Sequence, residues 1–382
     1  MDLPLSSSLD HYKVCHYSMR LNLEIDYQRL NGEVILHIQP VGGQQDGEYN
    51  ENIFELSLDC NDIEIEKIES VEEKEDSSLP FVSLLSHKLT PWVLTIRADV
   101  PGPPPSLIRV SYSTLPSSRS LLWRKDSTGE LGVHTAAGAV NNRGLLPCQD
   151  LPRALTTWDL TLTIPTQRGK PLWVYCTGDT QGEVTTMSDT IRWKFSTERH
   201  LPISAFALAI GGWSPVSLGP GIRLAGPGSL VHKHSEKLGE FLSKTVNIAT
   251  LLLRSAYPNV RTDLLIVHRS FSGLGLSSPN LIFLSPSLLA GDPALLIKLA
   301  HEVTHAWFGL HVFSLDWAET WVTEGFATFL EDMIFARVTR EDKRLAGIRA
   351  MTKLLQLEEE IAGTSNEEQV THMIWNSYWV DF

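Results

Sequence analysis

Several features that mark other classes of protein are scarce or missing in this sequence. The 382 residues include only 4 cysteines, which are widely spaced and form no CxxC pair, so reduced thiols are expected rather than a disulfide framework. The net charge of -13 leaves no basic excess for a nucleic-acid backbone. No apolar run is long enough to span a bilayer, and no secretory signal is visible. We therefore expect a cytoplasmic protein, with a nuclear location left open, that neither binds nucleic acid nor inserts into a membrane.

Motifs for nucleotide binding and for nucleophilic catalysis are also missing. The sequence has no phosphate-binding loop and no serine or cysteine nucleophile motif. The GLG at 273–275 is not followed by a glycine three residues later, so it is no dinucleotide fingerprint. Any catalytic activity must therefore come from another kind of site.

The chain is long enough for two domains, and its two halves differ in pattern. Up to about residue 200, short runs such as YSMRLNLEIDY and TWDLTLTIP alternate apolar and polar residues, as strands do. The charged stretch 66–78 is interpreted as an exposed turn. Later segments have helical spacing, at 230–256, 292–309, 320–338 and 341–362. These patterns predict an α+β fold with an N-terminal all-β domain, 1–205, and a mainly helical domain, 206–382.

The sequence HEVTH at 301–305 matches the HExxH zinc pattern. On a helix, His301 and His305 lie one turn apart on the same face, so both imidazoles can reach one metal ion. Glu302 lies beside that face, where it can act as the general base on a water that the metal activates. The Asp292-Pro293 pair independently predicts the start of this helix.

Glu324 supplies the third predicted ligand. Eighteen residues separate it from His305, and it lies in WVTEGFATFLED, which also has a helical pattern. Two antiparallel helices can bring this carboxylate opposite the two imidazoles, and such a set suits one Zn²⁺ per chain. The alternative is that the two histidines are only buried core residues and the glutamate lies on the surface. The combined spacing disfavours this alternative.

Glu331 lies two helical turns after Glu324 on the same face. It is either an outer carboxylate that accepts a hydrogen bond from a ligand imidazole or a solvated glutamate on the helix surface. Both readings stay open at this point.

The motifs together resemble the gluzincin aminopeptidases, the family that includes leukotriene hydrolase and aminopeptidase B. HEVTHAWFG and WVTEGFA are similar to the family's HExxHxWxG and WLNEGFA. NNRGLLPCQDLP at 141–152 resembles its PCxDxP segment, and 269–289 is similar to the strand before its zinc helix. The resemblance implies a saddle-like β domain, a thermolysin-like zinc domain and removal of single N-terminal residues from peptides, with basic residues such as arginine favoured in this branch.

The sequence departs from the family where the substrate's free amine is held. The family's GxMEN motif uses a glutamate for this, whereas Ser277 stands at that position here, and Gly138 stands where the β domain normally contributes a second polar anchor. A hydroxyl binds an ammonium group less strongly than a carboxylate does. The backbone of Gly273, Gly275, Leu276 and Ser277 is still expected to bind an extended peptide.

A second departure concerns the family's oxyanion-stabilising tyrosine, which lies in a Tyr-x-Lys-Gly context. That context is missing from the closing MIWNSYWVDF, where Tyr378 is the one tyrosine. We therefore expect a truncated form of the family, incomplete at its C-terminus.

Three hypotheses follow. The first is a zinc metalloaminopeptidase acting on peptides, with arginyl substrates a specific expectation from the resemblance. The alternative is a catalytically impaired, truncated zinc-binding module that binds peptides or a partner. A third keeps the hydrolytic zinc but acts on internal peptide bonds or a lipid epoxide, because both amine anchors are weakened.

Overall fold

The computed structural model of the chain describes residues 7–41, 53–72, 81–99, 104–125, 129, 131–136, 141–166, 171–178, 183–267 and 274–362. These residues divide into two compact units. The first along the chain, which we call the β unit, consists of Pro4–Trp123 and Val133–Gly212. The other, which we call the helical unit, contains Trp213–Phe382 with the short pieces Met1–Leu3 and Arg124–Gly132.

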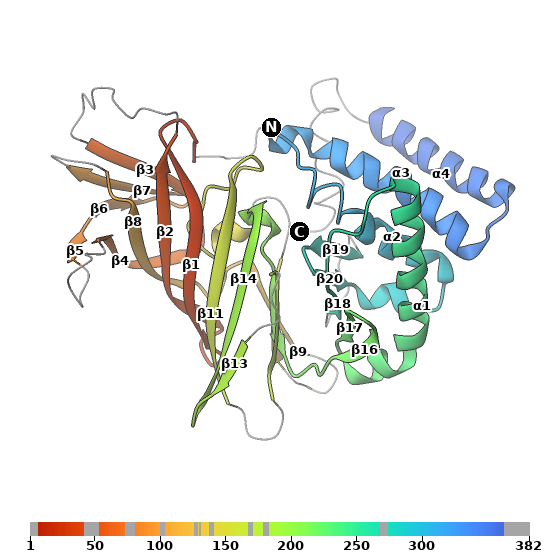
Figure 1. Cartoon of the computed structure of the whole chain (residues 1–382), viewed down its shortest axis with the longest axis horizontal. Helices are drawn as coiled ribbons and strands as arrows, with labels where there is room; N and C mark the ends of the chain where they lie inside the picture. The colour runs from red at the N-terminus through yellow and green to blue at the C-terminus, as the bar shows by residue number, and fades with distance from the viewer. Residues whose placement is uncertain are drawn as a thin grey trace. The chain divides into compact units, whose positions relative to one another are not determined.

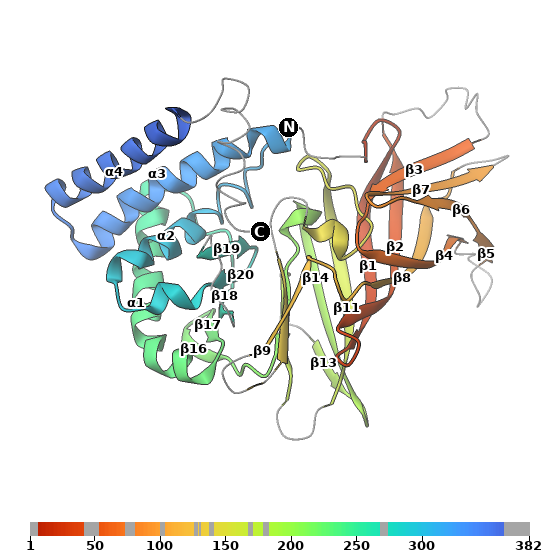
Figure 2. The same ribbon diagram turned by 180° about the vertical axis from the view of Figure 1, so that it is seen from behind.

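The β unit is built around an eight-stranded sheet with the order β13-β14-β11-β1-β2-β8-β4-β5 (Figure 2). Its strands are β1 (Tyr12–Glu24), β2 (Arg29–Pro40), β4 (Ile63–Glu72), β5 (Phe81–Leu84), β8 (Leu107–Thr114), β11 (Leu155–Pro165), β13 (Glu183–Thr186) and β14 (Thr190–Pro202). Strand β1 shows why the sequence forms this sheet, since Met19, Leu21 and Leu23 are buried while Arg20 and Asn22 between them are exposed. This period of two lets one face pack on the core.

Two smaller sheets accompany it. One has the order β12-β15-β10-β9 and the other β3-β7-β6. Their strands are β3 (Ile53–Asp59), β6 (Ser86–Leu89), β7 (Val93–Asp99), β9 (Leu121–Lys125), β10 (Leu131–Thr135), β12 (Trp173–Cys176) and β15 (Leu208–Gly211).

The stretch 66–78, expected as an exposed turn, is partly strand. Residues 66–72 belong to β4, where Ile68 and Val71 are buried. A register shift between Ile65 and Lys67 interrupts the alternation of apolar and charged residues. Such a bulge hides the period of two that identifies a strand in sequence. The rest of that stretch lies outside the described residues.

The helical unit contains a five-stranded sheet with the order β16-β17-β18-β20-β19. Its strands are β16 (Val216–Gly219), β17 (Ile222–Ala225), β18 (Thr262–Ile266), β19 (Gly275–Ser278) and β20 (Leu281–Leu284), and its helices are α1 (Gly228–Leu253), α2 (Ile297–Thr304), α3 (Thr320–Thr339) and α4 (Lys343–Ala362). The helices lie on one side of this sheet (Figure 1), where α1 packs against β16 and β17 and α2 packs against β19. The core they share contains Leu242, Leu264, Leu299, Val303 and Ile334, all buried.

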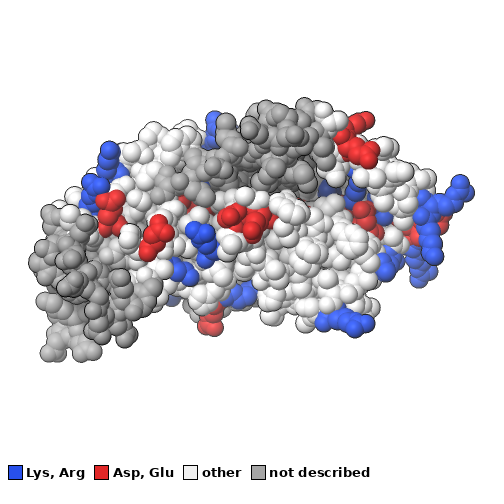
Figure 3. All heavy atoms as spheres, turned by 90° about the horizontal axis from the view of Figure 1, so that it is seen from above, with Lys and Arg blue, Asp and Glu red and all other residues white. Residues whose placement is uncertain are grey.

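These elements confirm the predicted α+β fold, with an all-β N-terminal domain followed by a helical one. None of the helices in the described ranges is both long and apolar enough to cross a membrane. On the face drawn in Figure 3, described Lys and Arg side chains are interspersed with Asp and Glu.

Candidate metal centre

Asp292 and Pro293 begin a 3-10 turn and not α2 itself, which starts at Ile297 and also ends earlier than the sequence predicts. The carboxylate of Asp292 accepts a hydrogen bond from the backbone N–H of Ala294 at 2.8 Å, and Pro293 opens a 3-10 turn that leads into α2. The helix was expected to continue to Gly309, yet it ends at Thr304 and His305 is its C-cap. Gly309 has a φ of +106° in the turn that follows, a conformation that favours glycine.

The two histidines of the motif face each other across one helical turn. Their Nε2 atoms are 3.0 Å apart, and the ring planes are inclined by 81°. The Nδ1 of His305 lies 2.9 Å from the carbonyl oxygen of Phe308, so it carries the proton that this acceptor requires. The Nε2 of His305 is then an acceptor that points at His301. Two facing nitrogen atoms at this separation need a cation or a proton between them.

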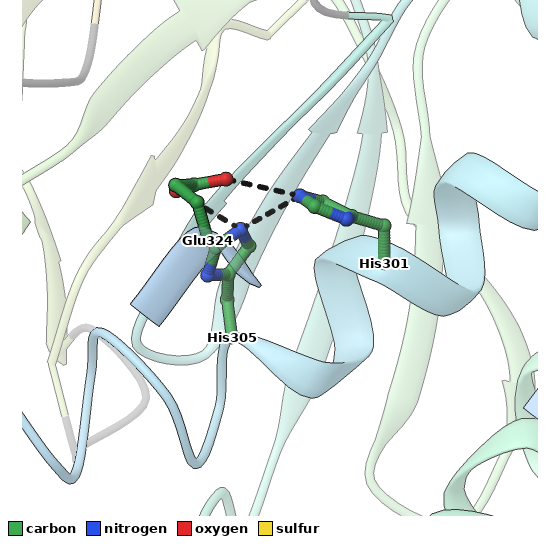
Figure 4. A group of neighbouring side chains, drawn as sticks. All are labelled: His301, His305 and Glu324. Carbon is green, nitrogen blue, oxygen red and sulfur yellow. Dashed lines mark hydrogen bonds and ion pairs between the residues drawn. The ribbon is translucent and has the colours of Figure 1, made fainter. Parts of the chain in front are cut away.

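Glu324 completes the group from α3. Its Oε2 lies 3.3 Å from Nε2 of His301, and its Oε1 lies 3.5 Å from Nε2 of His305 (Figure 4). The three candidate ligand atoms lie within 4.8 Å of one another, and this is the single such group among the residues that the structure describes. Two imidazole nitrogens and a carboxylate oxygen are the donor set that a catalytic zinc ion takes, with one position left open. The residues therefore fit the predicted zinc ion.

Electrostatics within the group also favour a bound cation. Burial alone would lower the pKa of His301, but the carboxylates of Glu324 and Glu331 raise it to about 10. The two carboxylates thus favour positive charge at this point, and a divalent cation would supply more of it than a proton does.

Glu331 lies directly behind His301. Its Oε2 is 2.8 Å from Nδ1 of His301, an ion-pair contact, and its side chain is fully buried. Lys353 of α4 donates to Oε1 of Glu331. Nζ of Lys298 lies 3.7 Å from Oε2 of Glu331. Burial would raise the pKa of Glu331, but His301 and the two lysines lower it to about 2. The arrangement is that of an outer carboxylate and not of a solvated one.

Glu302 is buried against strand β19. The hydroxyl of Ser277 donates toward Oε2 of Glu302 at 2.8 Å and toward the carbonyl oxygen of the same residue at 2.6 Å. A Cβ atom added to Gly275 would lie 2.4 Å from Cγ of Glu302, so only glycine leaves room for this side chain. Burial raises the pKa of Glu302, while His305, His301 and the Ser277 hydrogen bond oppose that rise.

The structure brings together most of the residues that the sequence singles out. Seven of them meet on α2 with its C-cap, α3 and β19, namely Gly275, Ser277, His301, Glu302, His305, Glu324 and Glu331. Leu276 pairs with Phe283 on β20 and is half-buried. Gly273, Gly138 and Tyr378 lie outside the described residues.

Lys353 is the residue of this site that sequence reasoning missed. Besides Glu331 it donates to Asp332 at 2.9 Å, from a helix that the sequence indicated only as amphipathic and charged. No spacing rule links a lysine on one helix to a carboxylate on another, so no sequence signal could have identified it.

An HExxH helix with a glutamate ligand from the next helix defines the class of gluzincin peptidases. The comparisons with known families agree, because residues 11–200 match the Peptidase M1 N-terminal domain and residues 240–378 match the Peptidase family M1 domain. The chain belongs to peptidase family M1, and the predicted resemblance is confirmed.

Individual relatives point the same way. Aminopeptidase O from Homo sapiens is 29% identical over 333 residues, which cover 73% of this chain and 40% of that protein. The motifs also predict aminopeptidase O as the most similar family member. Leukotriene A-4 hydrolase from Xenopus laevis is 25% identical, covering 98% of this chain and 60% of that protein. The chain therefore spans about 40% to 60% of these relatives' lengths.

A solved structure supports the fold. Native yeast LTA4 hydrolase superposes with a TM-score of 0.77 at 19% identity, over 94% of this chain and 54% of that chain. At this identity the likeness shows a shared fold.

Proposed function

We propose that this protein is a zinc metalloaminopeptidase that removes N-terminal residues, arginine among them, from peptides. The observation that carries the proposal is the convergence of His301, His305 and Glu324 on one point, with Glu302 held beside it. Membership of family M1 supports it, because zinc-dependent peptidases make up that family. We further propose 1–205 as the β domain and 206–382 as the catalytic domain.

Each residue has a defined part in this proposal. His301 and His305 would hold one zinc ion together with the carboxylate of Glu324, while Glu331 holds the ring of His301 in place. The bound ion would supply Lewis acidity for the scissile carbonyl and for the attacking water. Glu302 takes the proton from the attacking water and passes it to the leaving amine.

Strand β19 is the proposed binding site for the backbone of the peptide substrate. It stands at the end of the five-stranded order and pairs with β20 on one side. Gly275 and Leu276 on this strand, together with Gly273 before it, would bind an extended peptide by strand addition. This places the peptide chain along the same strand that carries Ser277.

Two other functions are favoured by specific observations. Helices α3 and α4 expose large apolar side chains, among them Trp321, Phe329 and Ile348, which would suit a zinc-binding module that recruits a partner with little catalysis. The engagement of Ser277 by Glu302 favours instead a hydrolase that does not require a free substrate amine, such as one acting on internal peptide bonds or a lipid epoxide.

Hydrolysis of an arginyl chromogenic substrate by the zinc-loaded protein tests the proposal. Glu302→Gln should abolish turnover, by at least about 100-fold, while zinc stays bound. Glu240→Gln is the matched control, because Glu240 is 64% exposed on α1 and should change nothing. Activity that survives in Glu302→Gln would refute the assigned base. A wild type that binds zinc but does not hydrolyse the substrate would favour the zinc-binding module that recruits a partner.

An N-acetylated peptide separates the remaining alternative. An aminopeptidase rejects a blocked N-terminus, whereas a hydrolase of internal bonds cleaves blocked and free peptides at similar rates. A rate ratio near one would therefore replace the aminopeptidase proposal with the third hypothesis.

A further inference from the structure

The hydroxyl of Ser277 bridges two different parts of Glu302. It lies 2.6 Å from the backbone carbonyl oxygen and 2.8 Å from Oε2 of the side chain. The two residues are 25 positions apart in the chain and belong to β19 and α2. A contact this short to both the backbone and the side chain fixes the direction in which the carboxylate leaves the helix.

The Glu302 side chain is confined from a second direction by the same strand. Gly275 lies so close that an added Cβ would sit 2.6 Å from Oε1 and 2.4 Å from Cγ. In the described chain, Ser277 is the one hydrogen-bond donor to the Glu302 carboxylate. Packing therefore limits where this carboxylate can go, and the hydroxyl selects one orientation among those that remain.

A glutamate has several rotatable bonds, and an unanchored one would occupy many rotamers. Ordering such a side chain costs about 1.5–2 kcal/mol of conformational entropy. A general base must lie within hydrogen-bond reach of the proton it takes, so an anchor that holds one rotamer raises the fraction of chains ready to react.

We propose that Ser277 is a positioning residue for the general base, and that its hydroxyl serves Glu302 rather than the substrate. This inference rests on the proposed peptidase function. The hydroxyl carries a single proton, which the two acceptors of Glu302 share. Ser277 thus acts on turnover and not on the binding of the substrate's amine.

Kinetics of three variants test the proposal. Ser277→Ala should lower kcat about 10- to 100-fold, the effect of losing one hydrogen bond to a charged group, while KM stays within about twofold. Ser277→Thr keeps the hydroxyl and should restore most of kcat. Ser278→Ala is the matched control, since successive side chains of a strand point to opposite faces, and it should leave kcat unchanged. A Ser277→Ala variant that raises KM with an unchanged kcat would overturn the proposal.

A double-variant cycle measured by chemical unfolding separates this inference from the proposed function. Ser277→Ala, Glu302→Ala and the double variant are compared with the wild type, all with zinc content measured. Shifts in the unfolding midpoint that do not add show that the two side chains are coupled, even if no peptide is hydrolysed. Additive shifts overturn the positioning of Glu302 by Ser277. A wild type that hydrolyses none of the peptides contradicts the proposed function. The double-variant cycle still shows whether Ser277 and Glu302 are coupled.

Discussion

Two clusters of histidine and carboxylate side chains lie in different parts of this chain, and their polar atoms are partnered differently. In the β unit, His16 lies between two partners, with Nδ1 2.7 Å from Oγ1 of Thr157 and Nε2 2.7 Å from Oδ1 of Asp159. Ser18 donates to the same Asp159 oxygen at 2.8 Å, and its Oγ is 3.2 Å from Nε2 of His37. Both nitrogens of His16 are therefore engaged by protein atoms.

In the helical unit, the nitrogens of His301 and His305 point at each other. Each ring uses Nδ1 for a protein partner and turns Nε2 toward the same point, which Glu324 also faces. The residue types are the same as in the β unit, but here three donor atoms converge without a protein group between them. The comparison teaches that a metal site is recognised where donor atoms of several side chains converge on one point.

The difference has a structural cause. The parallel pairing of β1 with β11 sets His16 beside Thr157 and Ser18 beside Asp159, so a sheet face supplies a partner for each group. Helix α2 places its two histidines one turn apart, and the carboxylate must come from α3. The sheet thus supplies partners for its own polar groups, whereas α2 and α3 bring three donor atoms to one point.

Removal of one ring from each cluster gives the largest expected contrast. His305→Ala should weaken zinc binding by more than about 100-fold, since the loss of an outer partner alone costs 10- to 100-fold. His16→Ala should leave one zinc ion per chain, because that cluster offers no converging set. Metal content after dialysis measures both, and zinc loss in His16→Ala would erase the distinction between the clusters.

A smaller loss of zinc affinity is expected when Glu331, which contacts the predicted ligand His301, is changed. Glu331→Gln removes the charge that faces Nδ1 of His301 but keeps the size of the side chain, so zinc affinity should fall about 10- to 100-fold. Competition with a chelator measures the affinity. Asp332→Asn, which changes the neighbouring carboxylate on α3, is the control and should have little effect. Equal losses in the two variants would mean that general charge, not contact with His301, sets the affinity.

The smallest effect is expected in the β unit and depends on pH. Burial would raise the pKa of Asp159, but hydrogen bonds from His16 and Ser18 lower it below its usual value. A carboxyl with a lowered folded pKa adds stability above its unfolded pKa of about 3.9, and the gain is lost as pH falls through the folded value. Asp159→Asn should therefore cost less than about 1 kcal/mol at pH 7, since the side chain is 45% exposed. Urea unfolding at pH 7 and pH 3 measures this, and a difference that grows toward pH 3 would contradict the sign.

Much of the candidate site could be predicted from local patterns. The capping pair at Asp292 and the spacing of His301 and His305 both follow from helix geometry, which is a short-range property of the chain. Glu324 could be added because α3 is the next helix along the chain and its own pattern is helical. The assignment of these residues as zinc ligands stays a prediction, as do the domain bounds at 205 and 206.

Other features had no local signal. The end of α2 at Thr304 depends on the turn that lets the Phe308 carbonyl reach His305. The strand over 66–72 was misread because a bulge broke its period.

By itself, the sequence determined the α+β class, the helices that carry the site and the residue types that can bind zinc, since periodicity and capping act over a few residues. Only the tertiary structure decided that Glu331 is buried against His301, that Lys353 reaches it from α4, and that Ser277 is tied to Glu302. Each of these three contacts joins residues on two different helices or on a helix and a strand. They form when elements pack, and packing depends on the whole surrounding core rather than on neighbouring residues.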